Sequence, residues 1–228
     1  NMVLLALALA PAFVIMIFIY IKDKYEKEPI KLLLKNFGLG ATASIIITLI
    51  LGLILKIIFP TADPLSISQQ FLKAFIIVAL VEEFSKYLIV RYYAQRNKEF
   101  DEPFDGIVYA VMVSMGFAAL ENVMYVFQFG MSNGIVRAFT AVPAHATFGI
   151  IMGYYMGKAK FAATKKDEIK LNLTGLFAAT AFHGTYDFFL FINFIPGISI
   201  GAFVSLIIGV VMARKAIKKH QARSQFKH

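Results

Sequence analysis

The chain contains no cysteine and unusually few charged residues. Asp, Glu, Lys and Arg together make up 16% of its 228 residues. Without cysteine there can be no disulfide bonds and no thiolate metal sites, so any metal must be held by His, Asp or Glu. Because soluble globular domains typically carry about 25% charged residues, the low charge excludes that class of protein.

Long apolar runs take the place of the missing charge. Hydrophobic residues make up 59% of the chain, and the mean hydropathy is +0.70. A bilayer core of about 30 Å needs about 20 apolar residues to cross it. Seven windows of roughly this length lie near residues 2–21, 37–59, 71–91, 105–128, 136–157, 171–193 and 196–213. The sequence therefore predicts an all-α polytopic membrane protein with about seven transmembrane helices, forming a single domain over residues 1–228.

The first window resembles a signal peptide only in its position. It lacks a basic region before the apolar run and ends in charge rather than at a small-residue cleavage site. We expect it to be a retained first span. The next segment, residues 22–35, mixes charged residues with apolar ones at helical spacing, which predicts an amphipathic helix on the inner leaflet.

The positive charges alternate along the chain. Lys and Arg gather after the first, third, fifth and seventh windows and are nearly absent from the other connections. The positive-inside rule then places the amino terminus outside and the carboxyl terminus in the cytoplasm. The net charge of +9 lies in these short segments rather than on an aromatic-studded surface, so membrane orientation explains it and nucleic acid is not an expected partner.

Several ionisable residues lie within the apolar windows. They come from four different windows: Glu82, Glu83 and Lys86; Glu121; His145; His183 and Asp187. A charged side chain near the bilayer centre costs roughly 2.5–3.5 kcal/mol on insertion scales, which makes such residues functional candidates. Counting 1.5 Å per residue from the window ends puts these groups at compatible depths, from the midplane to the outer half. We expect them to share one pocket.

The charges in such a pocket would not balance. Four carboxylates facing Lys86 leave about three negative charges if all ionise, which a low-dielectric site does not tolerate. Protons could neutralise them through raised carboxyl pKa values. A divalent cation held by two imidazoles and one carboxylate could do the same, and this ligand set suits catalytic zinc, with a free Glu as general base.

The same residues fall into motifs in a defined order. The chain reads Glu82-Glu83-x-x-Lys86, Phe117-x-x-x-Glu121-Asn122, His145-x-x-x-Gly149 and His183-x-x-x-Asp187, preceded by DKYEKEP at residues 23–29. This pattern resembles the PrsW family of intramembrane proteases, which is related to the CAAX-prenyl protease/Abi superfamily. The resemblance implies a multi-pass peptidase of the bacterial cell membrane. Its substrate would be a single-span, membrane-anchored anti-sigma factor, which receives its first (site-1) cut near the extracytoplasmic side.

The resemblance also suggests roles for the polar residues. As a hypothesis, Glu121, His145 and His183 hold zinc, and Asp187 orients His183 or supplies a fourth ligand. Glu82 or Glu83 activates the water, Lys86 balances the two glutamates, and Asn122 donates to the developing oxyanion. The superfamily also includes enzymes interpreted as metal-free and glutamate-dependent, so that mechanism stays open.

Other functions fit parts of the same pattern. Intramembrane Glu, Asp and His also mark proton- or cation-coupled transporters, although the corresponding broken helices of two repeats are missing here. A binding-only receptor leaves the paired glutamates and two histidines unexplained. A CAAX-type prenyl protease receives its substrates from the cytoplasmic side, which the outer-half depth disfavours. For individual residues, structural roles compete: an ion pair for Glu82, Glu83 and Lys86, and helix packing for His145 and Asp187.

Overall fold

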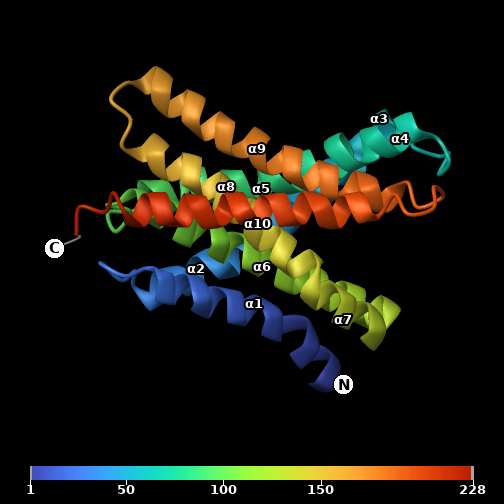
Figure 1. Cartoon of the computed structure of the whole chain (residues 1–228), viewed down its shortest axis with the longest axis horizontal. Coiled ribbons are helices and arrows are strands. Elements are labelled where there is room, and N and C mark those ends of the chain that lie inside the picture. The colour runs from blue at the N-terminus through green and yellow to red at the C-terminus, as the bar shows by residue number, and fades with distance from the viewer. Residues whose placement is uncertain (1, 227–228) are drawn as a thin grey trace.

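The structure is a computed structural model that describes residues 2–226, and these residues form helices and no strands. Figure 1 shows the helices as a bundle with the two termini at opposite ends. The α-helices are α1 (Met2–Lys22), α2 (Ile30–Leu39), α3 (Ile45–Ile58), α4 (Ile67–Leu72), α5 (Val81–Tyr92), α6 (Pro103–Phe129), α7 (Met131–Phe139), α8 (Ala141–Lys160), α9 (Lys165–Phe191) and α10 (Ile200–Gln221).

Two pairs of these helices are continuous through short π-helical turns. The turn η1 (Gly40–Ser44) joins α2 to α3, and η2 (Lys73–Leu80) joins α4 to α5; a 3₁₀ turn, η3 (Ala94–Arg96), follows α5. When α2 and α3, α4 and α5, and α7 and α8 are each counted as one segment, the described residues form seven long helical segments, as predicted. π-Helical turns inside α-helices are frequent at functional sites, and η2 ends two residues before Glu82.

Five segments are long and apolar enough to cross a membrane: Met2–Lys22, Ile30–Ile58, Pro103–Phe129, Met131–Lys160 and Ile200–Gln221. The segment 67–92 and α9 are also long enough but fall outside this set. These two segments carry Glu82, Glu83, Lys86, His183 and Asp187. Such polar residues lower the mean hydropathy of the segments that contain them. The chain is thus an all-α, multi-pass membrane protein, and the two less apolar helices are the ones with most of the predicted site residues.

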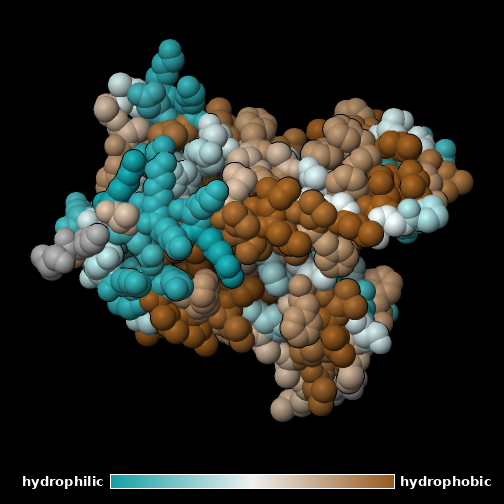
Figure 2. Space-filling view, in the orientation of Figure 1, coloured by the Kyte–Doolittle hydropathy of each residue, from teal (hydrophilic) through white to brown (hydrophobic). Residues whose placement is uncertain are grey.

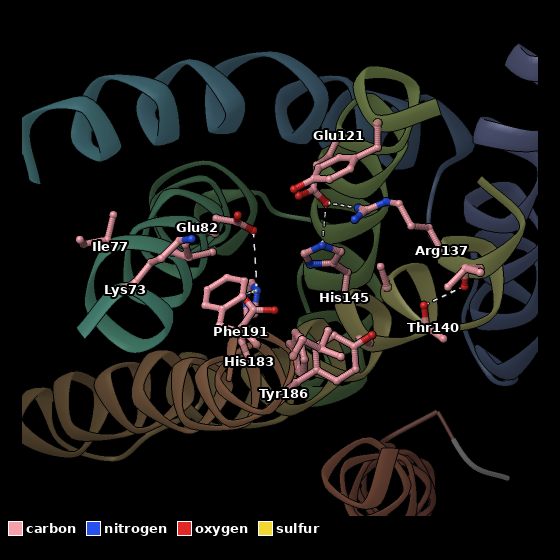
Figure 3. Close-up of a pocket in the computed structure, with 18 of the residues that line it drawn as sticks. Lys73, Ile77, Glu82, Glu121, Arg137, Thr140, His145, His183, Tyr186 and Phe191 are labelled. Atoms are coloured by element: carbon pink, nitrogen blue, oxygen red, sulfur yellow. Dashed lines mark hydrogen bonds and ion pairs between the residues drawn. The ribbon is translucent and has the colours of Figure 1, made fainter. Parts of the chain in front are cut away.

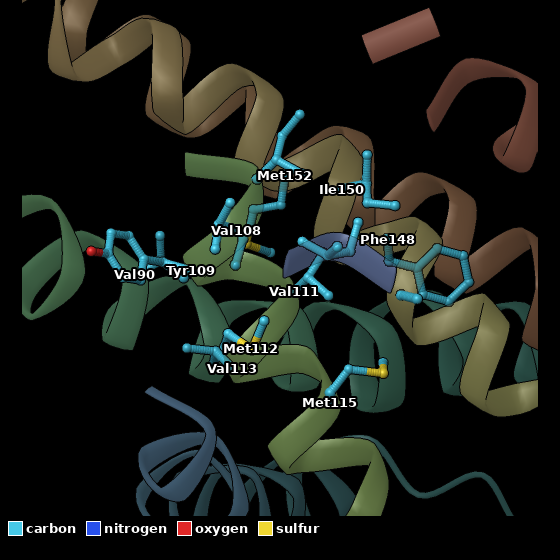
Figure 4. Close-up of a cluster of buried hydrophobic side chains, with 14 of the residues drawn as sticks. Val90, Val108, Tyr109, Val111, Met112, Val113, Met115, Phe148, Ile150 and Met152 are labelled. Carbon is cyan, nitrogen blue, oxygen red and sulfur yellow. The ribbon is translucent and has the colours of Figure 1, made fainter. Parts of the chain in front are cut away.

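The central helix of the bundle is α6. In its most apolar stretch 78% of the residues are buried, against 22% for α1 and 28% for α10. It packs closely against α8, because a Cβ built on Gly153 would lie 2.3 Å from the backbone oxygen of Gly106. Around this crossing, α6 and α8 contribute Val108, Met112 and Met152 to the buried core shown in Figure 4. The glycines of α8 therefore serve close helix packing.

The helix ends differ from several of the predicted windows: the second segment begins at Ile30 rather than 37, and α9 begins at Lys165 rather than 171. The fifth window, 136–157, is interrupted at Thr140, which separates α7 from α8. Pro143 has no backbone N–H and is best accommodated in the first turn of a helix, which is where α8 has it, two residues after Ala141. The seventh window, 196–213, begins later and runs longer, since α10 starts at Ile200 and continues through the basic tail to Gln221.

The amphipathic helix expected over residues 22–35 is present only in its second half. Residues 23–29 form an irregular loop, and a helix begins only at Ile30, after Pro29 at its N-cap. The loop folds inward rather than lying on a surface: Asp23 and Glu28 are buried, and Tyr109 of α6 donates a hydrogen bond to Glu28. The loop therefore joins α1 and α2 to the central helix.

The molecular surface is divided by polarity. Figure 2 shows hydrophilic residues gathered at the end near the carboxyl terminus, whereas apolar side chains cover the rest of this face. The last turn of α10 and the start of α9 supply basic residues at this end, including Lys218, Lys219 and Lys165. Opposite termini agree with an odd number of crossings (Figure 1). Which compartment each end faces remains a prediction.

Candidate active site

A cavity of about 490 Å³ lies among the helices that carry the motifs. Glu82 of α5, Glu121 of α6, His145 of α8, and His183 and Asp187 of α9 all line it. Figure 3 shows Glu82, Glu121, His145 and His183 pointing toward one another from different helices. The predicted convergence of four separate segments is therefore present in the fold.

The paired glutamates have different surroundings. Glu82 lines the cavity, whereas Glu83 is fully buried and points between the helices. Glu83 Oε1 lies 2.7 Å from Lys86 Nζ and 2.9 Å from His183 Nδ1. Lys86 Nζ is also 3.8 Å from Glu82 Oε2, so it lies close to both carboxylates. Only Glu82 of this pair is placed to meet a substrate.

Lys86 also connects α5 to α8. Its ammonium lies 3.2 Å from His145 Nδ1 and 4.2 Å from the centre of the Phe117 ring. An ammonium has only donors, so His145 Nδ1 must accept from it, and the proton of the neutral ring then resides on Nε2. His145 Nε2 lies 3.0 Å from Glu121 Oε2 and donates to that carboxylate. The two contacts fix the tautomer and the orientation of His145.

His183 is held in a similar way. Its Nδ1 bonds to Glu83, and its Nε2 faces the cavity carboxylates, 3.3 Å from Asp187 Oδ2 and 4.0 Å from Glu82 Oε2. The Asp187 contact comes from its i+4 position on α9, which places both side chains on one face of the helix. This position agrees with the predicted role of Asp187 in orienting His183.

Arg137 belongs to the same network, although its position in the sequence indicated only membrane topology. Its guanidinium lies 2.7 Å from Glu121 Oε2 and 2.8 Å from Asn122 Oδ1, above the ring of Tyr125. The short helix α7 brings it there. The only signal in the sequence was an isolated basic residue between two apolar windows. Its charge reduces the expected imbalance, because four carboxylates now face two cationic side chains.

Asn122 does not line the cavity. It is fully buried, its amide nitrogen donates to the backbone oxygen of Ala8 in α1, and its amide oxygen accepts from Arg137. Because Asn122 is fully buried outside the cavity, the predicted donation to an oxyanion has no support in this geometry. Asn122 instead ties α1, α6 and α7 together.

Three residues have the arrangement that a metal requires. Glu82, His145 and His183 each offer one ligand atom, and these atoms lie within 4.8 Å of one another. Glu82 Oε2 is buried and has no hydrogen-bond partner among the described residues. Two imidazoles and one carboxylate form a ligand set typical of catalytic zinc, so the residues fit such an ion. The predicted ligand Glu121 is not in this set, and its Oε2 instead contacts Arg137 and His145.

A cavity lined by carboxylates and imidazoles inside a helical membrane bundle is typical of a membrane-embedded hydrolase that activates water. Residues 28–214 match the family described as PrsW family intramembrane metalloprotease. Curated proteins named Protease PrsW are similar over most of their length. The one from Geobacillus kaustophilus is 35% identical over 97% of this chain and 95% of its own; that from Oceanobacillus iheyensis is 39% identical over 82% of both. The Bacillus subtilis protein is 34% identical over 82% of both chains. No solved structure matches this chain.

The chain belongs to the PrsW family, and it is a multi-pass membrane peptidase of bacteria. The family assignment confirms the resemblance seen in the motifs and favours the peptidase over the transporter and the receptor. The family description includes a metal, and the Glu82, His145 and His183 group agrees with it.

Proposed function

We propose that this peptidase makes the first cut in a single-span, membrane-anchored anti-sigma factor, close to the extracytoplasmic surface. The depth of the cavity supports this location. Glu121 lies eight residues before the end of α6 and His183 eight before the end of α9, or about 12 Å from each end. His145 is four residues, about 6 Å, from the start of α8. The positive-inside rule assigns all three of these ends to the outer surface.

The observation that carries the proposal is the joint placement of Glu82, Glu121, His145 and His183 around one cavity. A transmembrane substrate is protected from hydrolysis by the absence of water around its backbone, so an enzyme must bring water, a base and positive charge to one depth. The four helices do this together.

We assign the metal ligands to Glu82, His145 and His183. A cation held there supplies a bound water of lowered pKa and polarises the scissile carbonyl. Glu121 and Glu83 accept hydrogen bonds from the two imidazoles and so orient them, as carboxylates beside metal-binding His commonly do. Glu121 and Asp187 are the cavity carboxylates that are not assigned to the metal. They are therefore the groups available to take a proton from the attacking water.

The metal-free alternative uses the same side chains differently. Glu82 is then the general base, because Glu83 is sealed away from the cavity. Lys86 lies 3.2 Å from His145 Nδ1, so a cation bound through this nitrogen would have to displace the ammonium. The two mechanisms therefore differ in their response to removal of metal.

Cleavage of a candidate single-span substrate by the purified protein in lipid tests the proposal. Glu82→Gln and His183→Ala should each lower the rate at least about 100-fold, the usual scale of a lost acid–base group, whereas the surface variant Glu99→Gln should cleave normally. Mass spectrometry of the fragments should place the cut near the extracytoplasmic end of the span. Unchanged cleavage by both site variants would overturn the site. Full activity after thorough metal removal would leave the peptidase intact and transfer the proposal to the metal-free mechanism.

A further inference from the structure

A second group of acidic side chains lies toward the other end of α6. Glu26 and Glu28 come from the loop between α1 and α2, and Asp105 comes from the first turn of α6. Each offers one carboxylate oxygen, and the three oxygens lie within 4.8 Å of one another. Asp105 and Glu121 are 16 residues apart on the same helix, or about 24 Å along its axis. The group is therefore separate from the active site.

Two of these carboxyl groups are buried and only half satisfied. Glu28 is 1% exposed and Asp105 is fully buried. Asp105 Oδ2 accepts the backbone N–H groups of Asp101 and Glu102, at 2.8 and 2.7 Å, and Glu28 Oε2 accepts the Tyr109 hydroxyl. Glu28 Oε1 and Asp105 Oδ1 are buried with no hydrogen-bond partner in the described part of the chain. Buried oxygens left in this state are costly unless something binds them.

No basic side chain fills this role among residues 2–226. No Lys or Arg of this range makes an ion pair with Glu26, Glu28 or Asp105. Lys27 follows Glu26 directly, but it donates to the backbone oxygen of Tyr20 and its ammonium lies over the Tyr20 ring.

The charge around the group adds to the need for a counter-ion. Asp23 and Glu102 are buried nearby and are also acidic. Burial is the main cause that raises the pKa of Glu28 to about 10, with the neighbouring Asp105 as the next. A proton is therefore the occupant with which any cation must compete.

We propose that Glu26, Glu28 and Asp105 form a binding site for a hard divalent cation of the Mg²⁺ and Ca²⁺ class. Such ions take oxygen ligands and complete their coordination with water, for which the partly exposed Glu26 leaves access. The site holds no imidazole, so it should discriminate against the zinc-type ions that the active-site residues suit. A cation here ties the loop between α1 and α2 to the start of α6.

Terbium luminescence tests the site in the full-length protein in lipid. The chain contains no Trp, so Tb³⁺ emission on excitation at tyrosine wavelengths must come from nearby tyrosines, and the Tyr109 hydroxyl already contacts Glu28. We expect saturable emission that excess Ca²⁺ displaces. Glu28→Gln should weaken the binding at least about tenfold, since cation affinity follows the charge of the ligands.

Two control variants and a second measurement complete the test. Asp63→Asn removes a carboxylate from the loop between α3 and α4, and His183→Ala removes an active-site ligand; both should bind Tb³⁺ as the wild type does. Because Glu28→Gln is buried and could unfold the loop, Glu26→Gln serves as the milder ligand variant. Millimolar Ca²⁺ or Mg²⁺ should raise the Tm of the wild type by several degrees and that of Glu26→Gln by clearly less. The site would be overturned if the wild type showed no saturable emission and no Tm response. It would also be overturned if Glu28→Gln and Glu26→Gln both responded as strongly as the wild type.

Discussion

At the residue scale, Lys86 shows how the charges of this bundle depend on one another. The side chain is 1% exposed, and its ammonium contacts Glu83, His145 and the face of Phe117. A buried charge is tolerated only with such partners. The sequence predicted the pairing with the glutamates, because i+3 and i+4 positions on a helix are neighbours. It could not predict the contact with His145, which depends on how α5 and α8 face each other.

Removal of Lys86 should destabilise the fold strongly. Glu83 is buried and contacts Lys86 and His183, and Lys86→Met removes the first of these two partners. Breaking a buried ion pair in this way typically costs about 3–5 kcal/mol. Lys98→Met, at a side chain that is 91% exposed, is the matched control and should have little effect. Reversible unfolding in mixed micelles measures both. Equal free energies of unfolding for the two variants would contradict the proposed dependence.

Arg137 should matter for activity more than for folding. Its guanidinium contacts Glu121 and Asn122 at once, and Lys cannot replace this planar fork. We expect Arg137→Lys to lower kcat about tenfold or more while the Tm shifts by only a few degrees. Arg96→Lys, at an exposed position outside the cavity, should behave as the wild type. Normal kcat in Arg137→Lys would mean that Glu121 does not need this partner.

At the scale of the helices, apolar length predicted the segments well and their interruptions poorly. The windows at 2–21 and 105–128 agree with α1 and α6 to within two residues at each end. The break at Thr140 and the π-helical turn η2 were not predicted, since a hydropathy window averages over the few residues that cause them. The segment 22–35 was predicted as one amphipathic helix because its apolar residues from Ile30 onward follow helical spacing. That part is helical, whereas residues 23–29 form a loop in which Asp23 and Glu28 are buried and Glu28 contacts Tyr109 of α6.

The close crossing of α6 and α8 depends on glycine. A Cβ on Gly153 would lie 2.3 Å from a backbone oxygen of α6, and backbone cannot move as a flexible side chain does. Gly153→Ala should therefore separate the two helices and lower the Tm by several degrees. Gly52→Ala on α3 adds the same methyl group where nothing lies within 4 Å, so it should be neutral or slightly stabilising. Comparison of the two Tm values checks this, and equal values would show that the crossing tolerates a wider spacing.

At the scale of the whole molecule, the sequence predicted which residues meet but not how each one faces. Depth follows from counting residues along a helix, so the approach of Glu82, Glu121, His145 and His183 could be foreseen. Rotation about the helix axis depends on packing against neighbours. It decides that Glu82 rather than Glu83 lines the cavity, that Asn122 points to α1, and that Arg137 reaches Glu121. These assignments needed the tertiary structure.

The convergence of α5 and α9 at one cavity is the central claim, and thiol cross-linking in the membrane tests it most directly. The chain has no native cysteine, so a Glu82→Cys and His183→Cys pair can be joined by a short bifunctional thiol reagent without background. The two native side chains approach to 4.0 Å, which predicts rapid and nearly complete bridging. A Gly52→Cys and His183→Cys pair should stay unbridged. Failure of the first pair to cross-link, or equal bridging of both pairs, would contradict the account.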